Sequence, residues 1–158
     1  MDLGNFLFPL TWAGVGLAIL CGGIVGFERQ IRGKPAGMRT SILICLGTQV
    51  FVELGTAFSG PGTDPTRVLG QVVTGIGFLG AGVILARGGV VTGVTTASVV
   101  WLLAAIGCTI GFGHYGAAVV LAALTVAILN GIELLEASFR RLRSGPRDGD
   151  PRSRPNGP

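Results

Sequence analysis

The chain has 158 residues, of which 49% are hydrophobic and only 13% charged, with a net charge of +4 and a mean hydropathy of +0.66. A soluble globular protein carries about 25% charged residues, so this chain has too few charges to cover a water-exposed surface. The composition excludes an ordinary soluble domain, and long uncharged stretches decide the class.

Five apolar stretches are each long enough to cross a bilayer, whose apolar core of about 30 Å needs roughly 20 helical residues. We expect spans at about 8–27, 39–58, 68–86, 94–112 and 115–135. The N-terminus has no basic region typical of a signal peptide, so the first span is expected to be retained. The sequence thus predicts an all-α, polytopic integral membrane protein with a bundle of five transmembrane helices.

Basic residues follow the first, third and fifth spans, and this asymmetry sets the expected orientation. They are Arg29, Arg32, Lys34, Arg39, Arg87, Arg140, Arg141 and Arg143. An N-out/C-in topology places all of them in the cytoplasm, beside anionic lipid headgroups, and explains the net charge without nucleic acid as a partner. Residues 144–158 have no large apolar side chain, so we expect a disordered cytoplasmic tail after a membrane domain of residues 1–143.

Glycine accounts for 28 of the 158 residues, and small residues let helices approach closely in lipid. In the first span, Gly22 and Gly26 belong to a row of small residues that recurs every four positions. The third span carries Gly75, Gly77, Gly80 and Gly82, in a stretch that matches the G-x-G-x-x-G dinucleotide motif. That motif needs a preceding strand and an acid about 20 residues later, and both are missing. We therefore expect these glycines to be the packing centre of the bundle. The sequence leaves open whether this helix is straight, kinked or re-entrant.

Threonines begin the second and fourth spans on the predicted cytoplasmic side. Thr40 or Ser41, and Thr95 or Thr96, can cap these helices. Because helix N-termini attract anions, Lys34 and Arg39 would complete a small anion-binding patch; the alternative is plain capping with basic anchoring.

Two of the acidic residues in or beside the predicted spans are candidate functional residues. Glu28 precedes Arg32 by four residues, a favourable helical pair. Glu53 falls within the second span, one turn after Gln49. An intramembrane carboxylate is costly and marks a cavity or a partner, so the two either line a polar pocket or Glu53 lies at the membrane interface.

On the predicted outer side, Thr63-Asp64-Pro65 is typical of a helix start. Arg67 follows in the first turn, where the helix dipole disfavours a cation. This indicates a partner for Arg67, either Asp64 or Glu53, with Gln71 one turn deeper.

Catalytic and metal-binding patterns are absent from the sequence. There is one histidine, no C-x-x-C and no paired carboxylates, so we expect no metal cage, no cofactor and no enzyme. Cys21, Cys45 and Cys108 fall within spans and are expected to be small buried hydrophobes.

Several blocks in order resemble the MgtC/SapB family of bacterial membrane proteins. They are Gly26-Phe27-Glu28-Arg29, Lys34-Pro35-Ala36-Gly37-Met38-Arg39-Thr40, Asp64-Pro65-Thr66-Arg67, Gln71 to Ile84, and Gly93-Val94-Thr95-Thr96-Ala97. Glu53 is outside this pattern, so it ranks below Glu28, Arg39, Asp64 and Arg67 as a family-level site.

The resemblance implies a multi-pass protein of the bacterial inner (plasma) membrane, linked to magnesium limitation and to virulence. Family members look like non-enzymatic regulators of other membrane proteins, including the proton-translocating ATP synthase, with a sensor kinase or a homo-oligomer as further expected partners. Its best-known members carry an extra cytoplasmic domain after the fifth span, which these 158 residues do not include. The alternative is a small transporter or channel for Mg²⁺ or an anion.

Overall fold

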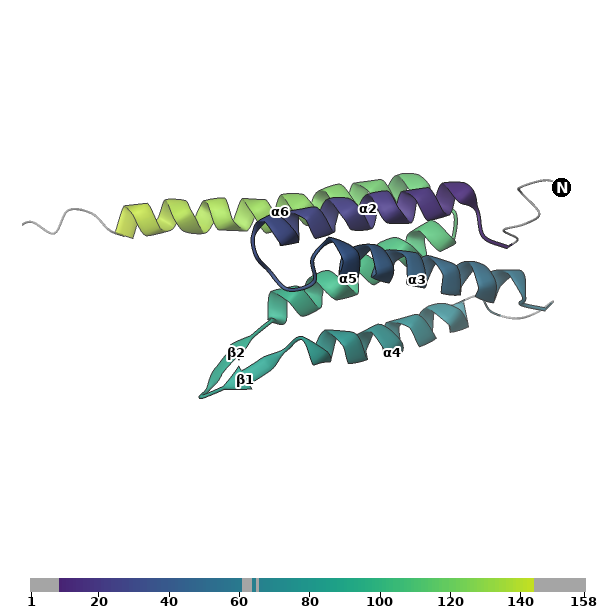
Figure 1. The fold of residues 1–158 in the computed structure, drawn as a ribbon, viewed down its shortest axis with the longest axis horizontal. Coiled ribbons are helices and arrows are strands. Elements are labelled where there is room, and N and C mark those ends of the chain that lie inside the picture. The colour runs from purple at the N-terminus through teal and green to yellow at the C-terminus, as the bar shows by residue number, and fades with distance from the viewer. Residues whose placement is uncertain (1–8, 61–63, 65, 144–158) are drawn as a thin grey trace, which may run out of the picture. The chain divides into compact units, whose positions relative to one another are not determined.

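The computed structural model describes residues 9–60, 64 and 66–143, with the backbone alone for residues 87 and 132–143. Within these residues the chain forms helices and one short β-hairpin (Figure 1). The elements are α2 (Trp12–Ile31), α3 (Met38–Ala57), α4 (Thr66–Gly82), β1 (Leu85–Arg87), β2 (Val90–Thr92), α5 (Val94–Gly111) and α6 (Tyr115–Arg143). The predicted tail, residues 144–158, lies outside the described residues.

The chain divides into two compact units, residues 1–126 and 127–158. Helices α2 to α5 and the start of α6 belong to the first unit. Within it, α2, α3 and α5 contact one another, and α4 packs against α5 and α3 (Figure 1). The described part of the second unit is the continuation of α6 from residue 127.

Small residues bring α2, α3 and α5 together at close range. A Cβ atom placed on Gly22 would lie 2.8 Å from the Cα atom of Ile42, and one on Gly26 would lie 2.5 Å from the Cα atom of Met38. Further along α3, a Cβ atom on Gly107 of α5 would overlap the Thr48 hydroxyl and the Cys45 carbonyl. The backbones therefore meet where a side chain would not fit, as expected for helices held by van der Waals contact.

Each helix start has its own local cause. Thr11 caps α2, because its Oγ1 atom accepts a hydrogen bond of 3.1 Å from the Gly14 amide. Gly37 precedes α3 and Gly93 precedes α5, and neither helix has a side-chain cap. The prediction that Thr40, Ser41, Thr95 or Thr96 caps these helices is therefore wrong, because the helices begin before these residues.

The segment after α4 differs from the predicted third span. The helix ends at Gly82, and residues 85–92 form the antiparallel hairpin β1–β2, with Leu85 opposite Thr92. Gly88 and Gly89 both have positive φ values, 56° and 80°, which suit a two-residue hairpin turn. The expected helix over 68–86 is therefore too long at its C-terminal end, and the fold is mostly rather than entirely helical.

The other helices follow the predicted spans, with shifted ends. The break between α5 and α6 falls at the predicted glycine cluster, where Gly113 has a φ of 80°. Helix α2 runs four residues past its predicted end, and α6 runs eight residues past residue 135. By length and composition, α2, α3 and α5 can each cross a membrane, while the apolar part of α6, Tyr115–Gly131, is shorter. The five-span topology and its orientation stay predictions.

Candidate functional site

A buried arginine connects α2 to α5 near the end of α2. Arg29 is 3% exposed, and its Nη2 atom donates a hydrogen bond of 3.0 Å to Thr96 Oγ1. The continuation of α2 to Ile31 carries Arg29 inside the bundle, where the sequence predicts a loop. Thr96 is buried for this contact, while Thr95, one residue earlier, is exposed. The structure thus singles out Thr96 from the threonine pair.

The neighbouring acid is also buried. Glu28 Oε1 forms an ion pair of 2.6 Å with Arg32 Nε, the predicted i,i+4 pair. Glu28 Oε2 and Arg29 Nε have no hydrogen-bond partner within the part of the chain that the structure describes. Burying a charged group with an unmet hydrogen bond is costly, so the cluster of Glu28, Arg29, Arg32 and Thr96 is a candidate functional site rather than a simple source of stability.

The other predicted residues at this end are on the surface. Lys34, Arg39 and Thr40 are exposed. At the start of α3, the Met38 amide donates a hydrogen bond of 3.4 Å to Gln30 Oε1. One helix-terminal amide is thus already engaged by a side chain, and the anion-binding patch stays a prediction.

Asp64 caps α4 at the opposite end of the first unit. Its carboxylate accepts hydrogen bonds of 2.9 Å from the Thr66 amide and 2.7 Å from the Thr66 hydroxyl. These bonds, the hydroxyl first, hold the pKa of Asp64 below its usual value, and the charge of Arg67 adds to the effect. The capping role of Asp64 is as expected, whereas Thr63 and Pro65 lie outside the described residues.

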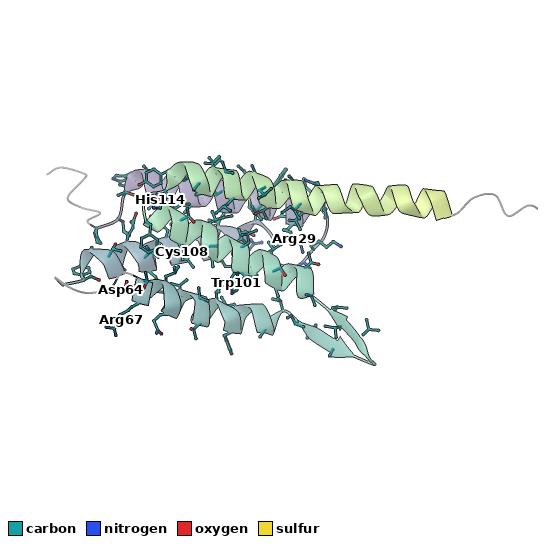
Figure 2. All side chains as sticks on the ribbon, turned by 180° about the vertical axis from the view of Figure 1, so that it is seen from behind. Arg29, Asp64, Arg67, Trp101, Cys108 and His114 are labelled. Carbon is teal, nitrogen blue, oxygen red and sulfur yellow. The ribbon has the colours of Figure 1, made fainter. Side chains whose placement is uncertain are left out.

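 Arg67 and Gln71 are both exposed, and Arg67 forms no ion pair with Asp64 or Glu53 among the described residues. Figure 2 shows Asp64, Arg67 and His114 near one end of the first unit and Arg29 nearer the other. Of the two predicted partners, Asp64 is the one on which the charge of Arg67 acts, without a close ion pair between them among the described residues. A cation in the first turn of α4 is tolerated because its side chain reaches solvent.

Glu53 lies inside the bundle, where it meets a residue that sequence reasoning missed. Glu53 is 7% exposed, and its carboxylate accepts hydrogen bonds from the amide and the hydroxyl of Thr11, at 3.2 and 3.1 Å. Tyr115 OH lies 3.1 Å from Thr11 Oγ1. These contacts place Glu53 in a polar group inside the bundle, while its depth relative to the membrane interface stays a prediction. Its partners come from the cap of α2 and the start of α6, and no spacing in the sequence indicates them.

The glycines of α4 are not the packing centre of the bundle, which corrects the prediction. A Cβ atom on Gly75, Gly77 or Gly82 would meet nothing within 4 Å, and Gly80 alone of the four lies near α5, at 3.9 Å from Ala97. Only Ile76 and Gly80 of α4 are buried. An apolar cavity of about 70 Å³ remains between α4 and α5, lined by Trp101 and Cys108 (Figure 2). The tight packing lies at Gly22, Gly26 and Gly107 instead.

The sequence model of the MgtC family matches residues 15–138. The match covers well over half of the chain. The chain belongs to the MgtC family. The resemblance inferred from the sequence motifs is confirmed, and together with the long apolar helices it shows a membrane protein.

Named relatives are similar over most of this chain. The putative magnesium transporter YhiD of Escherichia coli (strain K12) is 44% identical over 119 residues, 71% of this chain and 55% of that protein. Protein MgtC of Brucella abortus (strain 2308) is 44% identical over 132 residues, 81% of this chain and 54% of that protein. Protein MgtC of Salmonella typhimurium (strain LT2) is 40% identical over 129 residues, 82% and 54% of the two chains. The chain spans about half the length of the curated relatives it matches, and no solved structure matches it.

Proposed function

We propose that this chain is a non-enzymatic regulatory protein of the bacterial inner membrane, which binds other membrane proteins through the open face of α4. The observation that carries the proposal is the exposure of glycines on that helix. Gly70, Gly75, Gly77 and Gly82 have no neighbour within 4 Å of a Cβ position. They form two rows on the open side of α4, Gly70 with Gly77 and Gly75 with Gly82, and we call these four residues together the glycine face of α4.

Large apolar side chains lie beside the glycine face. Phe78 is 82% exposed and Leu79 is 51% exposed. In lipid, exposed apolar side chains are ordinary, but glycines are informative because they allow another helix backbone to approach closely. Because the large aromatic ring of Phe78 stands beside glycines without side chains, a partner helix can pack its backbone against the glycines and its side chains against the ring. Another membrane protein's helix fits this chemistry better than a soluble ligand does.

The link to magnesium limitation rests on the family and on the names of relatives. One relative is named a putative magnesium transporter, and the resemblance connects family members with adaptation to low magnesium and with virulence. The first partners to test are the proton-translocating ATP synthase and a membrane sensor kinase. Self-association of this chain is the competing use of the same face.

The experiment uses the full chain as the sole family member in a bacterium grown at low magnesium. The variant Gly75→Leu/Gly77→Leu fills the glycine face, and Gly16→Leu with Gly47→Leu is the matched control, since those glycines of α2 and α3 are also open. We expect the α4 variant to lose low-magnesium growth and co-purification of the ATP synthase or kinase, while the control keeps both. Equal behaviour of the two variants would contradict the proposal.

A second candidate function is a small transporter of Mg²⁺ or an anion. The observation that favours it is the pair of buried polar side chains Gln49 and Glu53 within α3. Flux of Mg²⁺ or an anion in proteoliposomes, lost in Arg39→Ala or Asp64→Ala, would support transport and overturn a purely regulatory role. Absence of flux with every tested ion would count against the transporter.

A further inference from the structure

Three helices bring polar side chains together where α2 begins and α3 ends. Glu53 comes from α3, Thr11 caps α2 and Tyr115 starts α6, and hydrogen bonds join Glu53 to Thr11 and Thr11 to Tyr115. Gln49 lies on α3 one turn before Glu53 and completes the group. We call Thr11, Gln49, Glu53 and Tyr115 the α3 polar site.

Gln49 is the unexplained member of this site. Its side chain is 0% exposed, and among the residues that the structure describes neither its Nε2 nor its Oε1 atom has a hydrogen-bond partner. A buried amide without partners typically costs about 1–3 kcal/mol, and most buried polar groups bind protein or ordered solvent. Gln49 therefore points to an occupant that the described residues do not supply.

The polar atoms converge on the bare surface of Gly14. A Cβ atom placed there would lie 2.6 Å from Thr11 Oγ1, 2.7 Å from Gln49 Nε2 and 3.0 Å from Glu53 Oε1. Rotating the Gln49 amide by a half turn exchanges its nitrogen and oxygen, so either atom can face this point. Thr11, Gln49 and Glu53 thus bring three polar atoms, all of which can be oxygens, close together over the Gly14 Cα atom.

The site has an entrance. An open groove of about 410 Å³ is lined by Thr11, Glu53 and Tyr115, together with Thr56 and the turn before α6. Thr56 Oγ1 donates to the carbonyl groups of Val52 and Glu53 in its own helix. The groove gives an ion or water a path to the Glu53 carboxylate from the end of the bundle.

Within the described part of the chain, no positive side chain neutralises Glu53. The groups around it from α2, α3, α5 and α6 are neutral hydroxyls, an amide and glycines, and Tyr115 is the other titratable group in the site. His114, beside Tyr115, and Arg67, at the start of α4, are both exposed, and neither pairs with Glu53. A buried carboxylate is costly unless a positive charge compensates it.

We propose that the α3 polar site binds a small monovalent cation of the Na⁺ type, held by Glu53, Thr11 and Gln49. One carboxylate with neutral oxygens balances a single positive charge. Mg²⁺ demands octahedral geometry and usually retains several waters, and the described residues contain no group of three acidic, histidine or cysteine ligands. The site does not depend on how the glycine face of α4 is used.

The test measures thermal unfolding of the purified full chain in detergent, with NaCl, KCl, MgCl₂ or choline chloride at constant ionic strength. An ion that binds only the folded state raises Tm by roughly 5–10 °C at about 100 times its dissociation constant. We expect NaCl to raise Tm most, KCl less, and MgCl₂ no more than choline. Broadening of the sodium-ion NMR line by the same protein is the second readout.

Two variants and a matched control assign the effect to the site. Glu53→Gln removes the charge, and Gly14→Ala places a methyl group among the three ligands. Gly16→Ala is the control, because it lies on the same helix with nothing within 4 Å. We expect the first two to lose the sodium-dependent Tm shift and line broadening, and Gly16→Ala to keep both. A stronger Mg²⁺ effect, no sodium effect in the wild type, or a sodium effect that survives in folded Glu53→Gln would overturn the proposal.

Discussion

Arg29 on α2 donates a hydrogen bond of 3.0 Å to Thr96 on α5, across 67 positions of sequence. Both side chains are buried, so this bond joins two helices in a region with little solvent. The bond also gives distinct roles to two adjacent threonines of the Gly93-Val94-Thr95-Thr96 block. Thr96 faces the bundle, and Thr95 faces out.

Thr96→Val should destabilise the protein more than Thr95→Val. The first change leaves a charged Arg29 donor without its acceptor, which costs about 1–3 kcal/mol. The second is at an exposed position and should change the free energy of unfolding by less than about 0.5 kcal/mol. Unfolding of both variants by denaturing detergent measures the difference. Equal losses in the two variants would show that the Arg29 contact contributes nothing.

Gly107→Ala should destabilise the packing of α3 against α5. Its new methyl group would overlap the Thr48 hydroxyl and the Cys45 carbonyl, while Gly16→Ala meets nothing within 4 Å. Overpacking of this kind costs about 1–3 kcal/mol. The control should be neutral or slightly stabilising, because alanine favours a helix over glycine. The same detergent unfolding measures both, and a neutral Gly107→Ala would contradict the close approach of α3 and α5.

Gly93→Ala should disturb the junction between the hairpin and α5. Gly93 has a φ of 89°, and a Cβ atom there would overlap the Val83 carbonyl. Gly88→Ala is the matched control, since its φ is 56° and a Cβ atom there would meet nothing within 4 Å. Both variants share the strain of a positive φ, so any larger loss of Tm in Gly93→Ala measures the steric overlap alone. A larger loss in Gly88→Ala would argue against this geometry.

The first turn of α4 should loosen in acid. Hydrogen bonds from Thr66 lower the pKa of Asp64 in the folded chain. Such a group stabilises the fold above its unfolded pKa of about 3.9, and the stabilisation is lost as the pH falls through the lower, folded value. Amide exchange of Thr66 and Arg67 should accelerate in that window in the wild type. Asp64→Asn keeps a capping oxygen without a titrating charge, so its exchange should lack this acid transition.

The helices were predictable because their signal is local. Uncharged length and glycine punctuation set the boundaries of α3 and α5 within a residue or so of the observed ends, 57 and 111. The end of α4 was missed because Gly88 and Gly89 favour a hairpin turn inside an apolar stretch that reads as a continued helix. Local composition does not distinguish a continued helix from a β-hairpin for the apolar residues of β1 and β2.

The sites were less predictable because their contacts are long-range. Glu53 was a candidate from its charge alone, but its partner Thr11 is 42 residues away. The glycines of α4 illustrate the same limit. A glycine permits close approach, but the sequence does not show which helix approaches it. Gly22 and Gly77 look alike in the sequence, yet Gly22 contacts α3 and Gly77 has no neighbour within 4 Å of a Cβ position.

The central claim is that α4 offers its glycine face to another membrane protein. The most direct measurement replaces Phe78 of α4 with photoreactive p-benzoylphenylalanine in living cells at low magnesium, and Phe27 of α2, which is 55% exposed, as the matched control. We predict that position 78 forms an adduct with a different membrane protein and that position 27 does not. The adduct from position 78 should disappear in Gly77→Leu and persist in Gly16→Leu. An adduct only with a second copy of this chain, the same adducts from both positions, or none from position 78 would contradict the claim.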